Sequence, residues 1–253
     1  MSATQISNLE PEVFEITGLT AGYGATKILR DVTLTIAPGE TVCVLGANGA
    51  GKTTLVGAIA GLTDVFEGQI RLGQTDLVGR SAESRAATGI GVVPEGRRLF
   101  PKLSVEENLL IAFYHRRRTI SPEKRIALLD RTYELFPILA ERRNQPAGTL
   151  SGGQQQMVSV GRVLLLEPKL LLLDEPSFGL APIIIDRIYE VVKRLADSKE
   201  LSILLVEQSA GLALGVSDRA YVLQNGAVVA EGRSSDLKSD PSIKAAYLGE
   251  IAG

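Results

Sequence analysis

The chain has 253 residues, of which 45% are apolar and 22% charged, a balance typical of a globular protein with a sizeable core. Its formal net charge of −2 gives no electrostatic reason to expect a nucleic-acid-binding protein. The single cysteine, Cys43, excludes a disulfide within the chain and favours a reducing compartment.

The sequence favours neither secretion nor insertion into a membrane. Its first residues contain no basic stretch followed by an apolar one, so no signal peptide is expected. Apolar runs are short and interrupted by charge, glycine or proline, so no membrane span is expected. If the protein acts at a membrane, it therefore does so through a partner.

The first part of the chain predicts a small antiparallel sheet in front of a core strand. Apolar and polar residues alternate over Val13–Thr20 and Val32–Ile36, which is typical of half-buried strands. A tight turn carrying one aromatic residue is expected between them, at Ala21–Gly24. A turn at Pro38–Glu40 then leads into Thr41–Leu45, whose apolar run predicts a buried strand.

The next stretch, Gly46–Thr54, has the sequence GANGAGKTT, which is the pattern of a phosphate-binding P-loop. Its glycines let backbone N–H groups approach phosphate oxygens, and the helix predicted from Leu55 to Ala60 points its positive end there. Lys52 supplies a cation for the β- and γ-phosphates, and the Thr53 hydroxyl supplies a ligand for Mg²⁺. The residues expected to hold a nucleotide here are Gly46, Asn48, Gly49, Ala50, Gly51, Lys52, Thr53 and Thr54.

The middle of the chain changes from an α/β pattern to a helical one. Up to Val93 the pattern predicts two short strands, 68–72 and 89–93, around a helix, 81–87. A capping box at Ser104–Glu107 then opens a helix toward Tyr114. A second helix starts at Ser121, with apolar residues at helical spacing. These apolar residues are Ile126, Leu129, Tyr133 and Phe136.

The α/β pattern resumes after this helical insertion. Apolar strands without alternation, separated by helices, predict a mostly parallel sheet that is covered on both faces. Asn225 and Gly226 predict a hairpin, and the chain from Arg233 onward is predicted to be helical. The predicted helices are 151–166, 182–195 and 210–215, and the predicted strands are 170–173, 201–206, 220–223 and 227–230.

An acidic pair, Asp174 and Glu175, follows the apolar strand 170–173. Ligands of open α/β sheets bind at the carboxyl ends of the strands, where this pair is expected. In a P-loop enzyme Asp174 would hold Mg²⁺, and Glu175 would orient an attacking water or accept its proton. Without the P-loop, the same pair would indicate only the start of a helix.

The stretch Leu150–Gln156, LSGGQQQ, predicts a second anion site. Ser151 is expected to cap a helix, while Gly152 and Gly153 leave the next N–H groups bare. One chain with one nucleotide needs only one phosphate cradle, so this site is expected to cap the γ-phosphate of ATP held by another subunit. The alternative is an ordinary glycine-rich helix cap.

Together the three motifs, in this order and spacing, resemble the ATP-binding cassette of ABC transporters over nearly the whole chain. The stretches VPEGRRLFPKLSVEENL, DEPSFGLAPII and LLVEQSA are similar to the ATPase subunits of branched-chain (hydrophobic) amino-acid importers. The resemblance implies an α/β P-loop NTPase core, with a small antiparallel β-subdomain and a helical signature subdomain. It implies one domain, 1–253, in which about 12–101 and 167–253 form the core and about 102–166 the helical part.

The resemblance also implies roles for individual residues. Tyr23 would stack on adenine, although it is also open to a simpler interpretation as a turn tyrosine. Residues 177–181 would cross the interface between two cassettes. Ser151, Gly152, Gly153 and Gln154 would act on the partner's nucleotide. The implied catalytic residues are Glu175, Lys52 and Gln208, and the implied Mg²⁺ ligands are Thr53, Asp174 and Glu95.

Three positions depart from the general cassette pattern. Glu95 stands where glutamine is usual, Ala181 where aspartate is usual, and Gln208 where a histidine normally meets the γ-phosphate. Gln208 can donate a hydrogen bond but cannot carry a proton. The chain's one histidine, His115, lies in the helical insertion. These departures leave the rate of hydrolysis at this chain's own site open.

Two arginine clusters, 97–98 and 116–118, flank the helical insertion. Given the net acidity of the chain, a solvated face or a contact with a partner is favoured over a nucleic-acid surface.

The function that the resemblance implies is Mg-ATP hydrolysis that powers uptake of branched-chain amino acids or related solutes. The implied partners are transmembrane permease subunits, a second cassette and, indirectly, a solute-binding protein, with no nucleic acid. The implied location is cytoplasmic, on the inner face of the cell membrane. Two alternatives stay open, namely a non-transport ABC ATPase and a regulatory ATP-binding subunit with low turnover.

Overall fold

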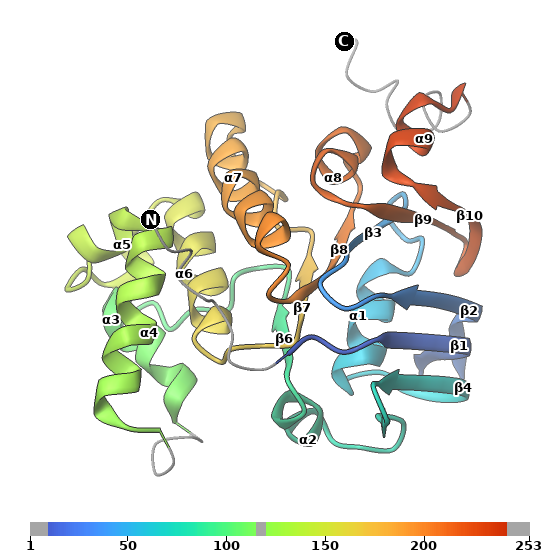
Figure 1. The fold of residues 1–253 in the computed structure, drawn as a ribbon, viewed down its shortest axis with the longest axis horizontal. Helices are drawn as coiled ribbons and strands as arrows, with labels where there is room; N and C mark the ends of the chain where they lie inside the picture. The colour runs from blue at the N-terminus through green and yellow to red at the C-terminus, as the bar shows by residue number, and fades with distance from the viewer. Residues whose placement is uncertain (1–9, 115–119, 242–253) are drawn as a thin grey trace.

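The computed structural model describes residues 10–114 and 120–241 and builds them on two β-sheets (Figure 1). The predictions made for His115, for the arginines at 116–118 and for a helix beyond residue 241 lie outside the described residues.

The smaller sheet is antiparallel, as predicted, with the strand order β2-β1-β4-β5. Its strands are β1 (Phe14–Tyr23), β2 (Thr26–Ile36), β4 (Asp64–Leu72) and β5 (Thr75–Asp76). The turn predicted at Ala21–Gly24 is misplaced, because β1 continues to Tyr23. Register shifts between Ile16 and Gly22 put consecutive residues on the buried side. These bulges break the alternation on which the prediction relied.

The larger sheet has the strand order β10-β9-β3-β8-β7-β6, and all its neighbours are parallel except the hairpin β9–β10. Its strands are β3 (Thr41–Leu45), β6 (Ile90–Val93), β7 (Leu170–Asp174), β8 (Ser202–Glu207), β9 (Arg219–Gln224) and β10 (Ala227–Arg233). Asn225 and Gly226 both have positive φ at the hairpin turn. The mostly parallel sheet of the sequence analysis is thereby confirmed.

Side chains from the two faces of this sheet enter two separate hydrophobic cores. In β7, Leu171 and Leu173 pack into the core formed with helices α6 (Gly152–Leu164), α7 (Pro182–Ser198) and α8 (Ala210–Val216). Leu170 and Leu172 pack into the core formed with α1 (Lys52–Ala60) and the antiparallel sheet. The large sheet is therefore the middle layer, and its carboxyl edge is left to carry the site. Two further helices are α2 (Ala82–Ala87) and α9 (Ser234–Ser239).

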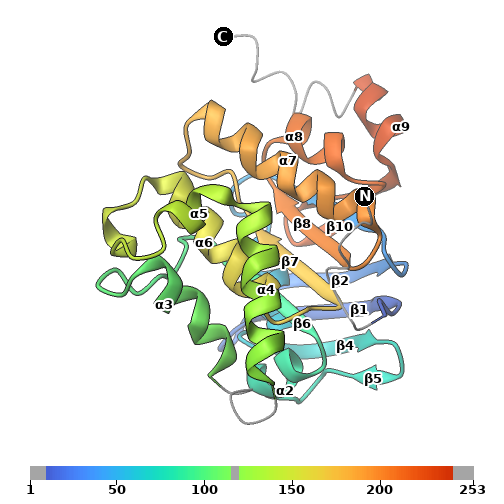
Figure 2. The same ribbon diagram turned by 60° about the vertical axis from the view of Figure 1, so that its left-hand side comes forward.

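The helical insertion gathers at one end of the molecule, beside β6 and β7 and away from the antiparallel sheet (Figures 1 and 2). It contains α3 (Val105–Leu110), α4 (Pro122–Leu135), α5 (Pro137–Glu141) and the 3₁₀ turns 111–113 and 147–149. The capping box of Ser104 and Glu107 is present at the start of α3.

Of the four apolar residues predicted to share one face of α4, Phe136 is buried and Leu129 and Tyr133 pack against the same core, but Ile126 does not. Ile126 is 59% exposed, whereas Leu128 and Thr132 are buried. The Thr132 hydroxyl donates to the carbonyl of Leu128 at 3.0 Å, so this polar side chain can occupy the buried face. The spacing of apolar residues alone could not place Thr132 on the buried face.

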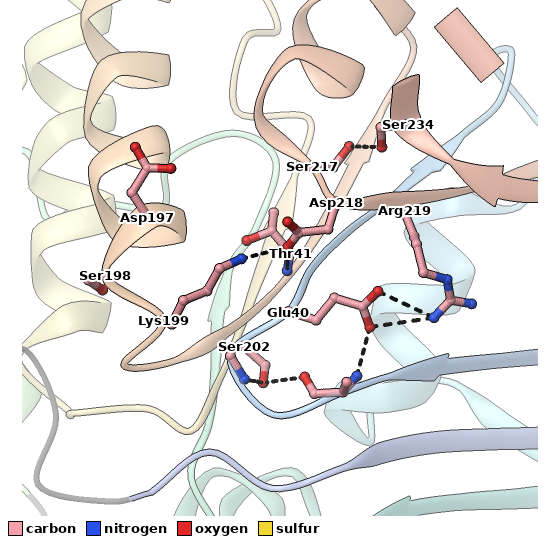
Figure 3. Close-up of polar contacts among 12 residues, drawn as sticks. Glu40, Thr41, Asp197, Ser198, Lys199, Ser202, Ser217, Asp218, Arg219 and Ser234 are labelled. Atoms are coloured by element: carbon pink, nitrogen blue, oxygen red, sulfur yellow. Dashed lines mark hydrogen bonds and ion pairs between the residues drawn. The ribbon is translucent and has the colours of Figure 1, made fainter. Parts of the chain in front are cut away.

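Polar contacts fasten the amino ends of the central strands, at the edge opposite the P-loop (Figure 3). The Asp218 carboxylate accepts from the Thr41 N–H at 2.9 Å and from Lys199 Nζ at 2.8 Å. Glu40 pairs with Arg219 at 3.3 Å. These contacts fix the strands on which the site is built.

Within the described ranges, no helix combines the length and the apolar character that crossing a bilayer requires.

Candidate nucleotide-binding site

A pocket of about 430 Å³ opens at the carboxyl ends of the parallel strands, over the P-loop. Its lining comes from the segments that follow β3, β6 and β7 and from the hairpin β1–β2. It brings together nine residues that the sequence analysis selected for the nucleotide or the chemistry, one, Phe178, that it placed in the interface loop, and one, Ile28, that it did not select. The lining residues are Tyr23, Ile28, Asn48, Gly49, Gly51, Lys52, Thr53, Thr54, Glu95, Glu175 and Phe178.

The P-loop has a backbone that only glycine fits easily. Gly51 has a φ of 109° and caps α1 without a side chain, so no side-chain oxygen occupies the first N–H groups of the helix. At Gly46, an added Cβ would lie 2.7 Å from the Leu223 carbonyl oxygen. The helix starts at Lys52 rather than at the predicted Leu55, which places Lys52, Thr53 and Thr54 in its first turn.

Lys52 is held in the centre of this loop. Its ammonium donates to the carbonyls of Gly46 at 2.7 Å and Ala47 at 3.1 Å, and it lies 2.9 Å from Glu175 Oε1. The side chain is only 3% exposed. All three of its protons therefore have acceptors, and a phosphate oxygen entering the pocket would replace one of them.

The acidic pair lies directly beside the loop. Asp174 ends β7, and its Oδ1 accepts a hydrogen bond from the Thr53 hydroxyl at 3.5 Å. Burial, followed by the nearby charges of Glu175 and Glu95, raises the pKa of Asp174 from 3.8 to about 6. Glu175 adopts a left-handed φ of 45°, and its N–H donates to the Val206 carbonyl at 3.0 Å.

These residues have the chemistry needed for Mg²⁺ that arrives with a nucleotide. A hydroxyl (Thr53) and a carboxylate (Asp174) lie side by side. The raised pKa of Asp174 reflects first its burial and then the negative charges of Glu175 and Glu95, and a divalent cation would offset both. The described residues contain no group of three or more His, Cys, Asp or Glu arranged to hold a metal. Mg²⁺ commonly takes one or two carboxylates, and phosphates and waters complete its shell.

The signature residues Ser151, Gly152, Gly153 and Gln154 do not line this pocket. They form the start of α6, where Ser151 and Gln154 make a reciprocal capping box. Gly153 packs against α7 so closely that a Cβ there would overlap Cγ2 of Ile184. The second anion site predicted from sequence thus lies apart from the first.

The first arginine cluster contacts this helix. The Arg97 guanidinium lies over Gly152 and donates to Gln155 Oε1 at 3.2 Å. Arg97 is therefore not part of a purely solvated face, whereas Arg98 is exposed.

The remaining predicted positions lie around the pocket. Gln208 does not line it, although it directly follows β8, the neighbour of β7. Gly46 and Ala50 belong to the loop but do not line the pocket. Ala181 precedes α7 without a side-chain cap. Sequence reasoning missed Glu207, which is 2% exposed at the end of β8. The available signal was an acidic residue directly after an apolar strand, the pattern that singled out Asp174.

Comparisons with known proteins agree with this geometry. The family model described as ABC transporter matches residues 29–178. The chain is 45% identical to the high-affinity branched-chain amino acid transport ATP-binding protein BraG of Pseudomonas aeruginosa, over 90% of this chain and 95% of that protein.

Two solved structures have the same fold. A nucleotide-free ATP-binding cassette from an ABC transporter superposes with a TM-score of 0.80 and 27% identity, over 93% of this chain and 98% of that one. A dimeric ATP-binding cassette in a post-hydrolysis state, bound to ADP and Pi, superposes with a TM-score of 0.77 and 25% identity, over 87% of this chain and 98% of that one.

Proposed function

Because the chain belongs to the ABC transporter family and is an ABC-type ATPase, we propose that its ATP hydrolysis powers uptake of branched-chain amino acids or related small solutes. One observation carries the catalytic part of this proposal. Lys52, Thr53 and Glu175 line one pocket, and the buried Asp174 contacts Thr53 directly behind it, although the acidic pair lies over 100 residues beyond the P-loop. The extensive identity with BraG supports the solute class.

The proposed mechanism assigns one task to each part of the pocket. The bare N–H groups at the start of α1, together with Lys52, bind the β- and γ-phosphates. Glu175 orients a water for in-line attack on the γ-phosphate and accepts its proton. Thr53 and Asp174, with Glu95 nearby, hold the Mg²⁺, which neutralises phosphate charge when bound. Tyr23 stacks on the adenine, and Gln208 donates a hydrogen bond to the γ-phosphate when two cassettes close.

We propose that a second cassette completes the site. Ser151, Gly152, Gly153 and Gln154 carry an anion-binding helix start but do not line their own chain's pocket. Facing a second cassette, they would cap the γ-phosphate that it holds. The dimeric post-hydrolysis relative supports such an arrangement. The second cassette is a sister subunit or a second copy of this chain.

Membership of the ABC transporter family also implies membrane partners. We propose that the chain binds transmembrane permease subunits at the cytoplasmic face of the cell membrane and that a solute-binding protein delivers the solute. We further propose that the chain is one domain, with a core of about 12–101 and 167–253 and a helical part of about 102–166.

Turnover and uptake test this proposal separately. The purified chain is assayed for phosphate release from Mg-ATP over a range of protein concentrations, beside Glu175→Gln. Turnover that rises faster than linearly and is lost in the variant supports a self-sufficient pair. Binding without turnover points to a sister cassette or to the regulatory alternative.

Uptake of labelled leucine is then compared in cells lacking the chain and in cells complemented with the parent or Glu175→Gln. Uptake unaffected by the loss of the chain contradicts a transport role.

A further inference from the structure

Glu207, the last residue of β8, is a buried carboxylate with donors from three different segments. Its Oε1 accepts from the Ser177 N–H at 3.2 Å and from the Tyr189 hydroxyl at 2.9 Å. Its Oε2 accepts from the Gln208 N–H at 3.2 Å. The side chain is 2% exposed, and no lysine or arginine among residues 10–114 and 120–241 forms an ion pair with it.

The backbone at the same point is tied to the nucleotide pocket. The Glu207 carbonyl accepts from the N–H of Gly46, the first P-loop residue, at 3.3 Å. The preceding carbonyl, of Val206, accepts from the N–H of Glu175 at 3.0 Å. The end of β8 is therefore in contact with the P-loop, the acidic pair and the segment that begins at Ser177.

A carboxylate at this position requires an explanation beyond strand formation. The other residues of β8 from Ile203 to Val206 are apolar and buried, and an apolar residue would extend that pattern. Burying a carboxylate without a cation is costly unless hydrogen bonds compensate for its lost hydration. Here three donors provide that compensation, and two of them belong to backbone loops at the carboxyl edge of the sheet.

We propose that Glu207 is a positioning residue that couples Gln208 to the loop 177–181. The Ser177 and Gln208 N–H groups are held by the two oxygens of one rigid, planar group. A displacement of Gln208 when it meets the γ-phosphate therefore moves the start of the loop 177–181. This inference rests on the proposed function, in which Gln208 contacts that phosphate and the loop meets the second cassette.

Glu207→Gln tests the bridge directly. A carboxamide has one acceptor oxygen, so the variant can hold the Ser177 side or the Gln208 side but not both. Hydrogen exchange of the Ser177 and Gln208 amides is measured by NMR on the full-length chain, without and with Mg-ATP. Mg-ATP turnover is measured on the same samples to give kcat and KM.

Tyr189→Phe is the matched control. It removes a hydrogen bond to the same Oε1 atom but leaves both backbone amides with their acceptors. We expect it to lower thermal stability while keeping exchange at both amides and kcat within about threefold of the parent. Glu207→Asp keeps two acceptors on a shorter stem, and it replaces the glutamine variant if that one does not fold.

The expected result for Glu207→Gln is roughly tenfold faster exchange at one or both amides, with kcat reduced roughly tenfold and KM nearly unchanged. Parent-like exchange at both amides would show that Glu207 does not bridge Ser177 and Gln208. Faster exchange with a parent-like kcat would show that the bridge has no role in turnover. Either result overturns the proposal. An equal loss of kcat in Tyr189→Phe also overturns it, because the effect would then be general packing. Failure of the proposed function appears separately, as solute uptake that does not depend on the chain. If the parent alone does not turn over, parent-like exchange at both amides in Glu207→Gln still overturns the bridge.

Discussion

Lys52 and Glu175 form an ion pair inside the nucleotide pocket, with Nζ 2.9 Å from Oε1 and the side chains only 3% and 11% exposed. The cation expected to bind phosphate is therefore paired with the carboxylate expected to act on water. Incoming phosphates would compete with Glu175 for Lys52, which frees the carboxylate at the moment when the substrate is in place. Binding and activation of the base would thus be linked through one lysine.

Glu175→Gln is expected to separate binding from hydrolysis. Loss of the base should reduce kcat by about 10²–10⁴-fold. ATP affinity should be equal to or higher than that of the parent, because a neutral amide competes less well with phosphate for Lys52. Phosphate release gives kcat, and a fluorescent-nucleotide titration gives Kd. Glu231→Gln, an exposed position on β10, is the matched control. Turnover at the parent rate in Glu175→Gln would show that another group is the base.

Asp174 is expected to make the nucleotide-free protein less stable as pH rises. Its pKa is about 6 in the folded protein and 3.8 ordinarily, so folding takes up a proton between these values. The stability from the protonated form is complete below about pH 4 and is lost as pH rises through 6. Relative to Asp174→Asn, the parent's free energy of unfolding should fall by on the order of 1–3 kcal/mol from pH 4 to 7. Urea unfolding with chelator present measures this difference, and a pH-independent difference would contradict the assigned pKa.

Tyr23 is expected to affect nucleotide affinity and little else. It lines the pocket at the end of β1 and is 51% exposed, which leaves its ring free for a base. Tyr23→Ala should raise the Kd for ATP by roughly 5- to 50-fold through lost stacking, with kcat at saturation preserved. Tyr23→Phe keeps the ring and should bind like the parent. An unchanged Kd in the alanine variant would favour the simpler view of Tyr23 as a turn residue.

Gly153 is expected to tolerate no side chain while Ile184 remains. A Cβ at this position would overlap Cγ2 of Ile184, so α6 and α7 would have to separate. Gly153→Ala should destabilise the protein by about 1–3 kcal/mol through overpacking. The double variant with Ile184→Ala should recover part of that loss, which a double-mutant cycle in urea measures. Gly152→Ala meets only the flexible end of Arg97 and serves as the control. Strict additivity of the two changes would argue against the contact.

Arg85 is expected to be the main support for the far end of the P-loop helix. Its buried guanidinium donates to the carbonyls of Ala58, Ile59 and Arg80. Arg85→Met should lower the free energy of unfolding by about 2–4 kcal/mol, because it leaves helix-end carbonyls without a donor. Arg80→Met, at an exposed side chain, should cost less than about 1 kcal/mol. Equal effects in the two variants would contradict this role.

Local patterns predicted most elements, because the interactions that define them span only a few residues. The capping box predicted at Ser104 and the helix cap predicted at Ser151 involve partners three residues away, and both are present. The predictions failed where distant contacts decide the outcome, as in the bulges of β1 against two neighbouring strands. On α4 they failed only for Ile126, which is exposed, and they missed Thr132, which is buried through a bond to its own helix.

The sequence by itself determined the P-loop, the acidic pair and the signature, because each is a short run whose spacing carries its chemistry. Only the tertiary structure decided that Lys52 pairs with Glu175 and that the pKa of Asp174 rises to about 6. The tertiary structure alone also shows that the Glu207 carboxylate accepts hydrogen bonds from Ser177, Tyr189 and Gln208. The physical reason is the strand order β3-β8-β7, which brings to one edge residues that lie far apart in the chain. Burial there strengthens charge interactions that no local pattern records.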